Sequence, residues 1–477
     1  MEKTGIKKSF KYKGFFKSIN DIALIVVLIV ILILVNIIAN RLPFKYDMTF
    51  EKIFSLSDQT KNVIRELKQD VKIVAFYQEG KEDETVKALL DEYVGAGEGK
   101  IKVEYLDAEK NPMIAKNYDI DNQGVLNESI VFESNGNIKK VNSTDIYTLN
   151  DAYGKAFSGE QQFTGAILYV AAPKLSKVYF LEGHEETNLN EDLFKLKGKI
   201  ETEAHVVESL NLIKEGGIPE DADVIVVVSP KRDIGNEEKE VLKDYLGKGG
   251  RALFLFDVLS ADVQLPNFSE IMKTFGIGIK NNFIIENDRN SFYSNNTLYL
   301  VPNYTEHVIV AGIKSESLAT ILPYSLNLEL LKSDDSNLII EPILKTSNNS
   351  WARYNLMDAS PNKSAEDVEG PTNVAVSVTR DNTDDRYEAT KIVAFGNSKF
   401  VENNMLDIQG NIDLFMNSVN WVLDKKEAIS IRAKMMNSNK LIVKGVSYIV
   451  LLVVSILVIP LLVFGTGWII WLRRRHS

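Results

Sequence analysis

The sequence contains no cysteine among its 477 residues. This absence excludes disulfide bonds, thiolate nucleophiles, iron–sulfur clusters and zinc–thiolate sites. The chain also lacks a GxGxxG dinucleotide fingerprint, a phosphate-binding P-loop, a GxSxG nucleophile elbow and an HExxH metal motif. We therefore do not expect this chain to hydrolyse ATP or to act through a serine or cysteine nucleophile.

Positive charge is scarce except at the two ends of the chain. The formal net charge is −10, from 55 Lys and Arg against 65 Asp and Glu. Residues 1–20 hold six lysines and one glutamate, and the chain closes with Arg473, Arg474 and Arg475. These ends carry +5 and +3, so the remaining body carries −18. Such a body disfavours nucleic acid and anionic lipid surfaces as partners.

Two long apolar runs flank the body, at residues 22–39 and 446–472. Each is close to the length of a membrane-spanning helix. The first follows the basic residues 1–21 and lacks a small-x-small cleavage site, which favours an uncleaved anchor over a signal peptide. By the positive-inside rule, 1–21 and 473–477 are predicted cytoplasmic tails. The sequence thus predicts a two-pass protein of the cell membrane, with both termini cytoplasmic and the main body extracytoplasmic.

Residues 46–147 show the order of a thioredoxin-like domain. Ser57 is predicted to cap a first helix. Strand, helix, strand, short helix and hairpin then follow, at 71–77, 85–94, 101–106, 107–120 and 129–141. Where a redox-active relative carries CxxC, this chain has Gln78, Glu79, Gly80 and Lys81. We therefore expect a domain that scaffolds or binds without thiol chemistry, followed by a linker at 148–160.

Residues 161–424 are predicted to form a second α/β domain. The central unit is 221–257, where apolar runs at 224–228 and 252–256 flank a helical stripe that Asn236 is expected to cap. Neither run alternates, so both indicate strands buried on two faces of a parallel sheet. The prediction is an open, mostly parallel sheet of the flavodoxin-like or amidotransferase-like kind. Residues 277–390 mix short apolar runs with polar clusters and are interpreted as a β-rich insertion.

Ligands of open α/β sheets gather at the carboxyl ends of the strands. The candidate ligand- or partner-binding residues at predicted strand ends are Gly183, His184, Glu185, Asp257, Asn397 and Ser398. His184 with Glu185 and Glu186 suits a metal site or a general base, with His205 and Asp223 as further possible ligands. No motif spacing connects these residues, so a loop that caps a helix or binds a partner is favoured. We predict no catalytic residue, no metal and no cofactor.

Several stretches in order resemble a known family. They are Asp47-Met48-Thr49 with Ser55-Leu56-Ser57, the strand ending at Gly183-His184-Glu185, 223–230 with 245–257, and Gly396-Asn397-Ser398 with 411–421. The chain resembles the auxiliary component of ABC transport systems named for bacterial gliding motility. The resemblance implies an exported domain, distantly similar to that of an intraflagellar-transport protein, that works beside a separate permease and a cytoplasmic ATPase. Glu186 departs from the family motif, and 277–390 does not align.

The main hypothesis is therefore a non-catalytic auxiliary subunit of an ABC-type transport system. Its expected partners are the permease, the ATPase and an envelope ligand or polysaccharide. Two alternatives remain open, an exported envelope-modifying enzyme and an envelope scaffold protein. The enzyme hypothesis requires a bound metal or a concave pocket that joins His184, Asp257 and Asn397.

Overall fold

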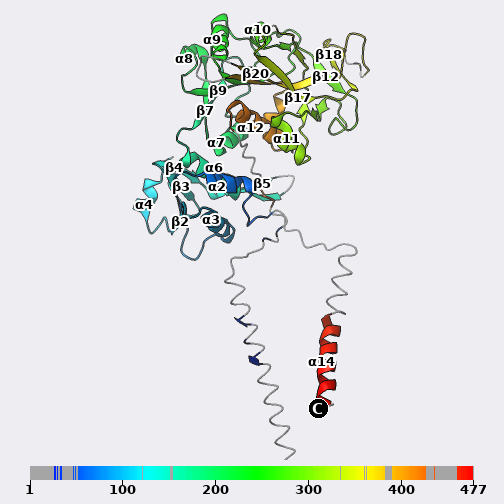
Figure 1. Cartoon of the computed structure of the whole chain (residues 1–477). Helices are drawn as coiled ribbons and strands as arrows, with labels where there is room; N and C mark the ends of the chain where they lie inside the picture. Colours follow the sequence, from blue (N-terminus) through cyan, green and yellow to red (C-terminus); the bar gives the residue numbers. More distant parts are fainter. Residues whose placement is uncertain are drawn as a thin grey trace, which may run out of the picture. The chain divides into compact units, whose positions relative to one another are not determined.

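The computed structural model describes most of the chain between the apolar runs. The described residues are 26, 27, 30, 33, 34, 47, 49, 52–120, 122–150, 154–333, 335–358, 360, 362–381, 389–425, 434–435 and 459–475. The chain divides into two compact units, Met1–Ser55 and Leu56–Ser477. Figure 1 shows the two α/β domains of the second unit.

In the first unit, the Asp47 carboxylate organises a short loop. It accepts hydrogen bonds from the amide of Thr49 at 3.0 Å, the amide of Phe54 at 2.8 Å and the hydroxyl of Ser55 at 3.1 Å. Burial raises the pKa of Asp47, but these hydrogen bonds outweigh it and lower the pKa overall. The Asp47 side chain thus connects Thr49 with Phe54 and Ser55.

The first domain of the second unit is built on a four-stranded sheet. Its strand order is β2-β1-β3-β4, with β1 parallel to β2 and the other pairs antiparallel. The strands are β1 (Val71–Phe76), β2 (Ile101–Leu106), β3 (Ile130–Ser134) and β4 (Asn137–Val141). The helices are α2 (Asp58–Glu66), α3 (Glu84–Ala96), α4 (Pro112–Asn117), α5 (Ser143–Ile146) and α6 (Gly159–Ala171).

Local sequence signals explain two of these boundaries. The Ser57 hydroxyl accepts a hydrogen bond from the amide of Thr60 at 3.2 Å, which confirms the predicted cap of α2. Asn135 and Gly136 have φ angles of 50° and 82°. Both lie in the left-handed region that a two-residue hairpin turn requires, within the hairpin predicted at 129–141.

The segment 148–160, predicted to be a linker, has strand structure. It contains β5 (Tyr147–Asn150) and β6 (Gly154–Phe157), and a third strand, β22 (Lys434–Met435), pairs with β6. The helix that follows, α6, packs on the first domain, with the ring of Phe163 5.5 Å from that of Phe132. The sequence placed this helix in the second domain because an apolar helix does not reveal which sheet it covers.

The second domain is built on an eight-stranded sheet of order β14-β17-β20-β21-β10-β9-β7-β8. The strands β7 (Ser176–Leu181), β8 (His205–Leu210), β9 (Ala222–Val228), β10 (Arg251–Leu255) and β21 (Ala389–Phe395) are mutually parallel. Numbered along the chain, these five lie in the order 2-1-3-4-5, as in one common type of doubly wound sheet. In this arrangement the direction of winding reverses between β7 and β9.

Helices cover both faces of this sheet (Figure 1). Strand β9 shows why: Val224, Val226 and Val228 belong to one core cluster, and Ile225 and Val227 belong to the other. The first cluster includes α7 (Phe194–Thr202), α11 (Val308–Ser315) and α12 (Asn411–Val422), and the second includes α9 (Asn236–Gly247) and α10 (Pro266–Thr274). The unbroken apolar run thus forms a strand buried on two faces, as predicted.

The cap of α9 differs by one position from the prediction. Asn236 is the first helical residue, and Gly235 is the cap. The Glu238 carboxylate, three residues after the cap, accepts a hydrogen bond from the Gly235 amide at 2.8 Å, as the acidic residue of a capping box does.

The predicted insertion, 277–390, is rich in strands, but it is not a separate lobe. Three of its strands, β14 (Asn303–Tyr304), β17 (Leu338–Lys345) and β20 (Asn373–Asp381), extend the main sheet in antiparallel fashion. The others form small sheets: β11 (Ile277–Ile279), β12 (Phe283–Glu286), β13 (Tyr299–Leu300), β15 (Leu322–Pro323), β16 (Leu328–Leu330), β18 (Ser350–Arg353) and β19 (Val368–Glu369). The remaining helices are α8 (Leu212–Glu215), η1 (Lys399–Val401) and α14 (Ile459–Arg475).

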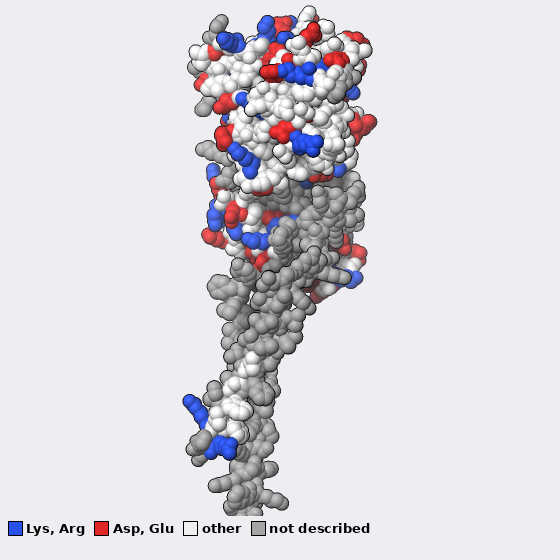
Figure 2. Space-filling model, turned by 90° about the vertical axis from the view of Figure 1, so that its right-hand side faces the viewer, with Lys and Arg blue, Asp and Glu red and all other residues white. Residues whose placement is uncertain are grey.

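Most of the predicted span at 22–39, and residues 446–458 of the second, lie outside the described residues. Among the described residues, no helix combines the length and apolar character needed to cross a bilayer. On the face of the body shown in Figure 2, acidic and basic side chains are intermixed.

Candidate functional site

The loop after β7 carries three of the predicted site residues. Gly183 has a φ angle of 123° and Glu185 one of 59°, so the chain turns sharply on either side of His184. The carbonyl of His184 accepts hydrogen bonds from the amides of Lys231 and Arg232, both at 3.0 Å. The loop after β7 is thereby fixed to the loop after β9, at the point where the winding of the sheet reverses.

His184 is buried between two carboxylates, with an exposure of 4%. Its Nδ1 lies 3.1 Å from Glu186 and its Nε2 lies 3.1 Å from Glu238 in α9. Burial lowers the pKa of His184, but the hydrogen bonds and charge of Glu186 and then Glu238 outweigh it, so the pKa is raised overall. An imidazolium donates from both nitrogens, which suits this arrangement.

This geometry favours a structural role for His184. Both ring nitrogens face carboxylates, so neither is directed toward a ligand or a substrate. The further metal ligands considered from the sequence, His205 and Asp223, lie near the amino ends of β8 and β9, at the opposite edge of the sheet. Among the described residues, no group of three metal-ligating side chains is able to hold an ion. Glu185 is exposed.

The other three predicted residues meet at the ends of β10 and β21. The amide and the hydroxyl of Ser398 donate to the Asp257 carboxylate at 2.7 and 2.6 Å. Asn397 is fully buried: its side-chain amide donates to the carbonyl of Pro323, and its side-chain oxygen accepts from the amide of Phe400 at 3.1 Å. These bonds fix the turn into η1 and the adjoining part of the insertion.

The six predicted residues therefore form two groups. One joins β7, β9 and α9, and the other joins β10, β21 and the insertion. A pocket adjoins the second group, and Asp257 lines it, but His184 and Asn397 do not. The enzyme hypothesis requires one pocket that joins His184, Asp257 and Asn397. The pocket beside Asp257 does not join these three residues.

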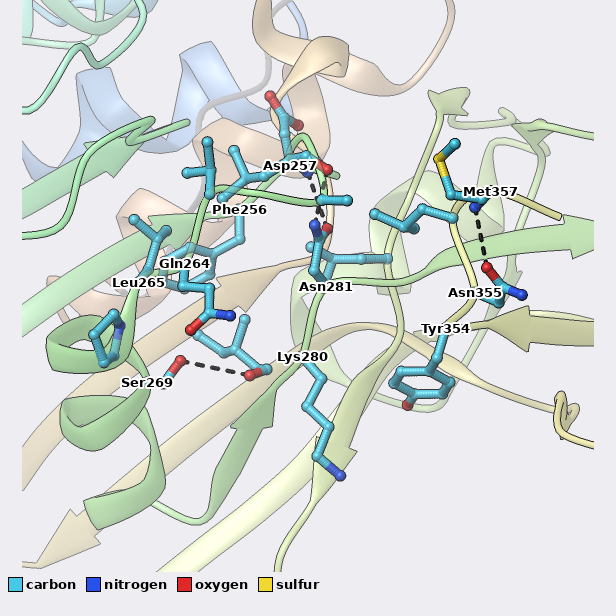
Figure 3. A pocket seen from close by; sticks show the side chains of 17 residues that line it. Phe256, Asp257, Gln264, Leu265, Ser269, Lys280, Asn281, Tyr354, Asn355 and Met357 are labelled. Atoms are coloured by element: carbon cyan, nitrogen blue, oxygen red, sulfur yellow. Dashed lines mark hydrogen bonds between the residues drawn. The ribbon is translucent and has the colours of Figure 1, made fainter.

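The pocket has a volume of about 510 Å³ and lies beyond the carboxyl end of β10 (Figure 3). Its apolar floor includes Phe256, Leu265 and Leu326, all buried. Side chains from the loop after β10, such as Gln264, lie on one side, and those that follow β18 lie on the other. Among the described residues that line it, the charged side chains are one aspartate, Asp257, and one lysine, Lys280.

Several interactions fix the walls of this pocket. The side-chain NH2 of Asn281 donates to the backbone carbonyl of Leu259 at 2.8 Å. The side-chain oxygen of Asn281 accepts from the backbone amide of Leu259 at 3.0 Å. The hydroxyl of Tyr354 donates to Glu329 at 2.9 Å. Burial raises the pKa of Tyr354 to about 12, so the hydroxyl stays protonated at neutral pH. Met357 on the rim is 85% exposed.

Sequence reasoning found only Asp257 of this pocket. Its other walls come from the loop after β10 and from 277–390, where the sequence pattern was too irregular to predict which segments meet. The apolar stretch Leu356-Met357 beside a polar cluster was the one available signal, because exposed apolar side chains often mark contact surfaces.

Taken together, the fold defines a class of protein: a doubly wound α/β domain with a pocket at its strand ends, preceded by a smaller α/β domain. Comparison with known families identifies it further. Residues 175–424 match the family described as "ABC-type uncharacterized transport system", and the chain belongs to that family. This confirms the resemblance to auxiliary components of ABC transport systems. Residues 50–148 match a family described only as a domain of unknown function.

No curated protein matches the chain. Among solved structures, the mmIFT52 N-terminal domain is 15% identical with a TM-score of 0.39, covering 52% of this chain and 97% of that one. The NTD_N/C domain of alkylhydroperoxide reductase AhpF from Enterococcus faecalis is 13% identical with a TM-score of 0.19, covering 33% and 79%. With TM-scores this low, no conclusion rests on these likenesses.

Proposed function

We propose that this protein is a non-catalytic auxiliary subunit of an ABC-type transport system, anchored in the cell membrane with its body outside the cytoplasm. Membership of the ABC-type family over 175–424 is the observation that carries the proposal. The chain has no P-loop, so ATP hydrolysis belongs to a separate subunit. The partners are then a permease, contacted through the apolar segments 22–39 and 446–472, and a cytoplasmic ATPase.

The finer fold assignments belong to the same proposal. The strand order 2-1-3-4-5 supports a flavodoxin-like second domain. The order β2-β1-β3-β4 with flanking helices supports a thioredoxin-like first domain. That domain has Gln78 to Lys81 where a redox-active relative has CxxC, so its role is to scaffold or bind.

The pocket beside Asp257 is the contact that we assign to an envelope ligand or partner. It is concave, largely apolar and nearly neutral in charge, with amide and hydroxyl groups around it. A concave, mostly apolar lining with a few polar groups is typical of sites that bind a ligand. In the His184 loop, by contrast, both ring nitrogens of His184 already face carboxylates, Glu186 of the loop and Glu238 of α9.

The test is affinity purification of the tagged full-length protein from its own membranes in mild detergent, followed by mass spectrometry. We expect a polytopic permease and an ATPase with Walker motifs to co-purify. Recovery of the protein without either subunit would contradict the proposal.

A pair of variants separates the pocket from the membrane contacts. Leu356→Asp places a charge in the pocket wall, and it should lose an envelope ligand or partner while it keeps the permease and the ATPase. Met113→Asp is the matched control, because Met113 is 83% exposed on α4, away from the pocket. If both variants lose the same protein, the pocket is not the contact.

A further inference from the structure

A single buried carboxylate connects two segments that are far apart in the sequence. Glu160 lies in the first turn of α6, and its side chain is 2% exposed. One carboxylate oxygen accepts hydrogen bonds from the amide of Ser57 at 2.6 Å and from the hydroxyl of Thr60 at 2.7 Å. The other oxygen lies 2.6 Å from the ammonium of Lys434, whose side chain is 14% exposed. We call these four residues the Glu160 joint.

The joint lies between the two apolar runs of the sequence. Ser57 and Thr60 open α2, in the segment that follows the apolar run 22–39. Lys434 lies in β22, in the segment that precedes the apolar run 446–472. Both segments that lead to predicted anchors are therefore bonded to the same side chain of α6.

The interactions around Glu160 leave little tolerance for a missing partner. The hydroxyl of Thr60 also lies 3.1 Å from that of Thr164, which lies 2.5 Å from the hydroxyl of Tyr93. Burial raises the pKa of Glu160, but Lys434, Thr60 and Ser57 outweigh it and lower the pKa overall. The carboxylate is thus ionised at neutral pH, and removal of Lys434 would leave a buried charge without its counter-charge.

The strand that carries Lys434 is too short to hold itself in place. Strand β22 pairs with β6 through two positions, Lys434 with Phe157 and Met435 with Ala156. So few ladder bonds scarcely offset the entropy lost when the chain is ordered. Among the described contacts of this segment, the ion pair with Glu160 is the one that buries a charge, so we expect its loss to weaken the attachment of β22.

We propose that the Glu160 joint is a coupling device that fastens both membrane-proximal segments to α6, so that movement of one segment is transmitted to the other and to the body. The proposal rests on the proposed function only where it treats the two apolar runs as anchors. The coupling between α2 and β22 is a property of this chain alone, and it is measurable in purified protein without any partner.

The absence of cysteine makes a cross-linking test clean. Ala156→Cys with Met435→Cys places two thiols at paired positions of an antiparallel ladder. Their Cα atoms are then about 4.5–5.5 Å apart, within the range of a disulfide. In the full-length protein in detergent, we expect mild oxidation to cross-link this pair. Lys434→Met or Glu160→Gln should slow the cross-link about tenfold or more.

A control pair monitors folding. Lys72→Cys with Glu133→Cys occupies paired positions of β1 and β3, and neither residue belongs to the joint. This pair should cross-link equally in all backgrounds. If the 156–435 pair also cross-links at one rate in all backgrounds, Glu160 does not hold β22 and the proposal fails.

Hydrogen exchange tests the coupling itself. In Lys434→Met, the amides of α2 at 58–66 should exchange faster than in the unmodified protein, because the partner of Ser57 and Thr60 loses its counter-charge. Protection of α2 that is unchanged while β22 is released would show two independent contacts and would overturn the coupling. Neither readout depends on a permease, so failure here leaves the transport assignment intact.

Discussion

At the scale of single residues, two buried histidines respond to pH in opposite directions. His184 has a raised pKa because Glu186 and Glu238 outweigh its burial. A group whose pKa is higher in the folded state stabilises the fold below its unfolded pKa, and this contribution is lost as the pH rises through the folded value. His184→Gln should therefore cost about 1–3 kcal/mol at pH 6 and less at pH 9. Thermal midpoints of both proteins across this range measure the difference.

The pKa of His205 is shifted in the opposite direction. It is 1% exposed, and burial, with the nearby Lys425, lowers its pKa to about 3. The unfolded chain therefore binds a proton more readily, and the folded state loses stability as the pH falls from about 6.5 toward 3. At pH 5 the loss is about 2 kcal/mol. His205→Gln should flatten the acid side of the stability profile. An acid side as steep as that of the unmodified protein would contradict this prediction.

The residues selected from the sequence are informative in another way. His184, Asp257 and Asn397 were found because polar side chains follow buried strands. Their roles were not evident, because the decisive partners are distant in the chain: Glu238 for His184, Ser398 for Asp257 and Pro323 for Asn397. A strand end indicates where a side chain lies. It does not indicate whether that side chain is already hydrogen-bonded to other residues of the protein.

At the scale of elements, two glycines in neighbouring helices make a matched comparison. A Cβ atom on Gly165 of α6 would lie 1.9 Å from the carbonyl oxygen of Thr202, at the end of α7. A Cβ atom on Gly198, inside α7, would meet nothing within 4 Å. Gly165→Ala should destabilise the protein by about 1–3 kcal/mol because the two helices must separate. Gly198→Ala should stabilise it by about 0.5–1 kcal/mol because alanine favours helix. Equal thermal midpoints for the two variants would contradict the close approach of α6 and α7.

The elements also show how far a sequence predicts a fold. Continuous apolar runs such as 224–228 and 252–256 form strands close to the predicted limits, because burial on both faces leaves an unambiguous pattern. The sequence pattern predicts a linker where β5 and β6 lie. The pairing of β6 with β22 joins parts of the chain that are distant in the sequence, so no local pattern reveals it. The sequence also does not predict that β17 and β20 join the main sheet. They lie at the antiparallel side of the sheet, within a region whose pattern is broken by polar clusters.

At the scale of the whole molecule, the predicted membrane topology has a direct test. The chain has no cysteine, so one introduced thiol reports one position. Met357→Cys, at a residue that is 85% exposed, should react with a membrane-impermeant maleimide in intact spheroplasts. Ser9→Cys, in the lysine-rich tail, should react only after lysis. Labelling of Ser9→Cys in intact spheroplasts would reverse the assigned orientation.

The pairing of β6 with β22 also has a consequence for biosynthesis. The whole second domain is inserted between the two strands, so about 280 residues are translated after Phe157 before Lys434 emerges. At a synthesis rate of about 5–20 residues per second, the edge of β6 stays unpaired for roughly 15–60 s before β22 is made. During that time the three-stranded sheet β22-β6-β5 is incomplete, and the unpaired edge is open to wrong partners. Completion of a sheet that begins at Tyr147 is thus among the last events of synthesis of the chain.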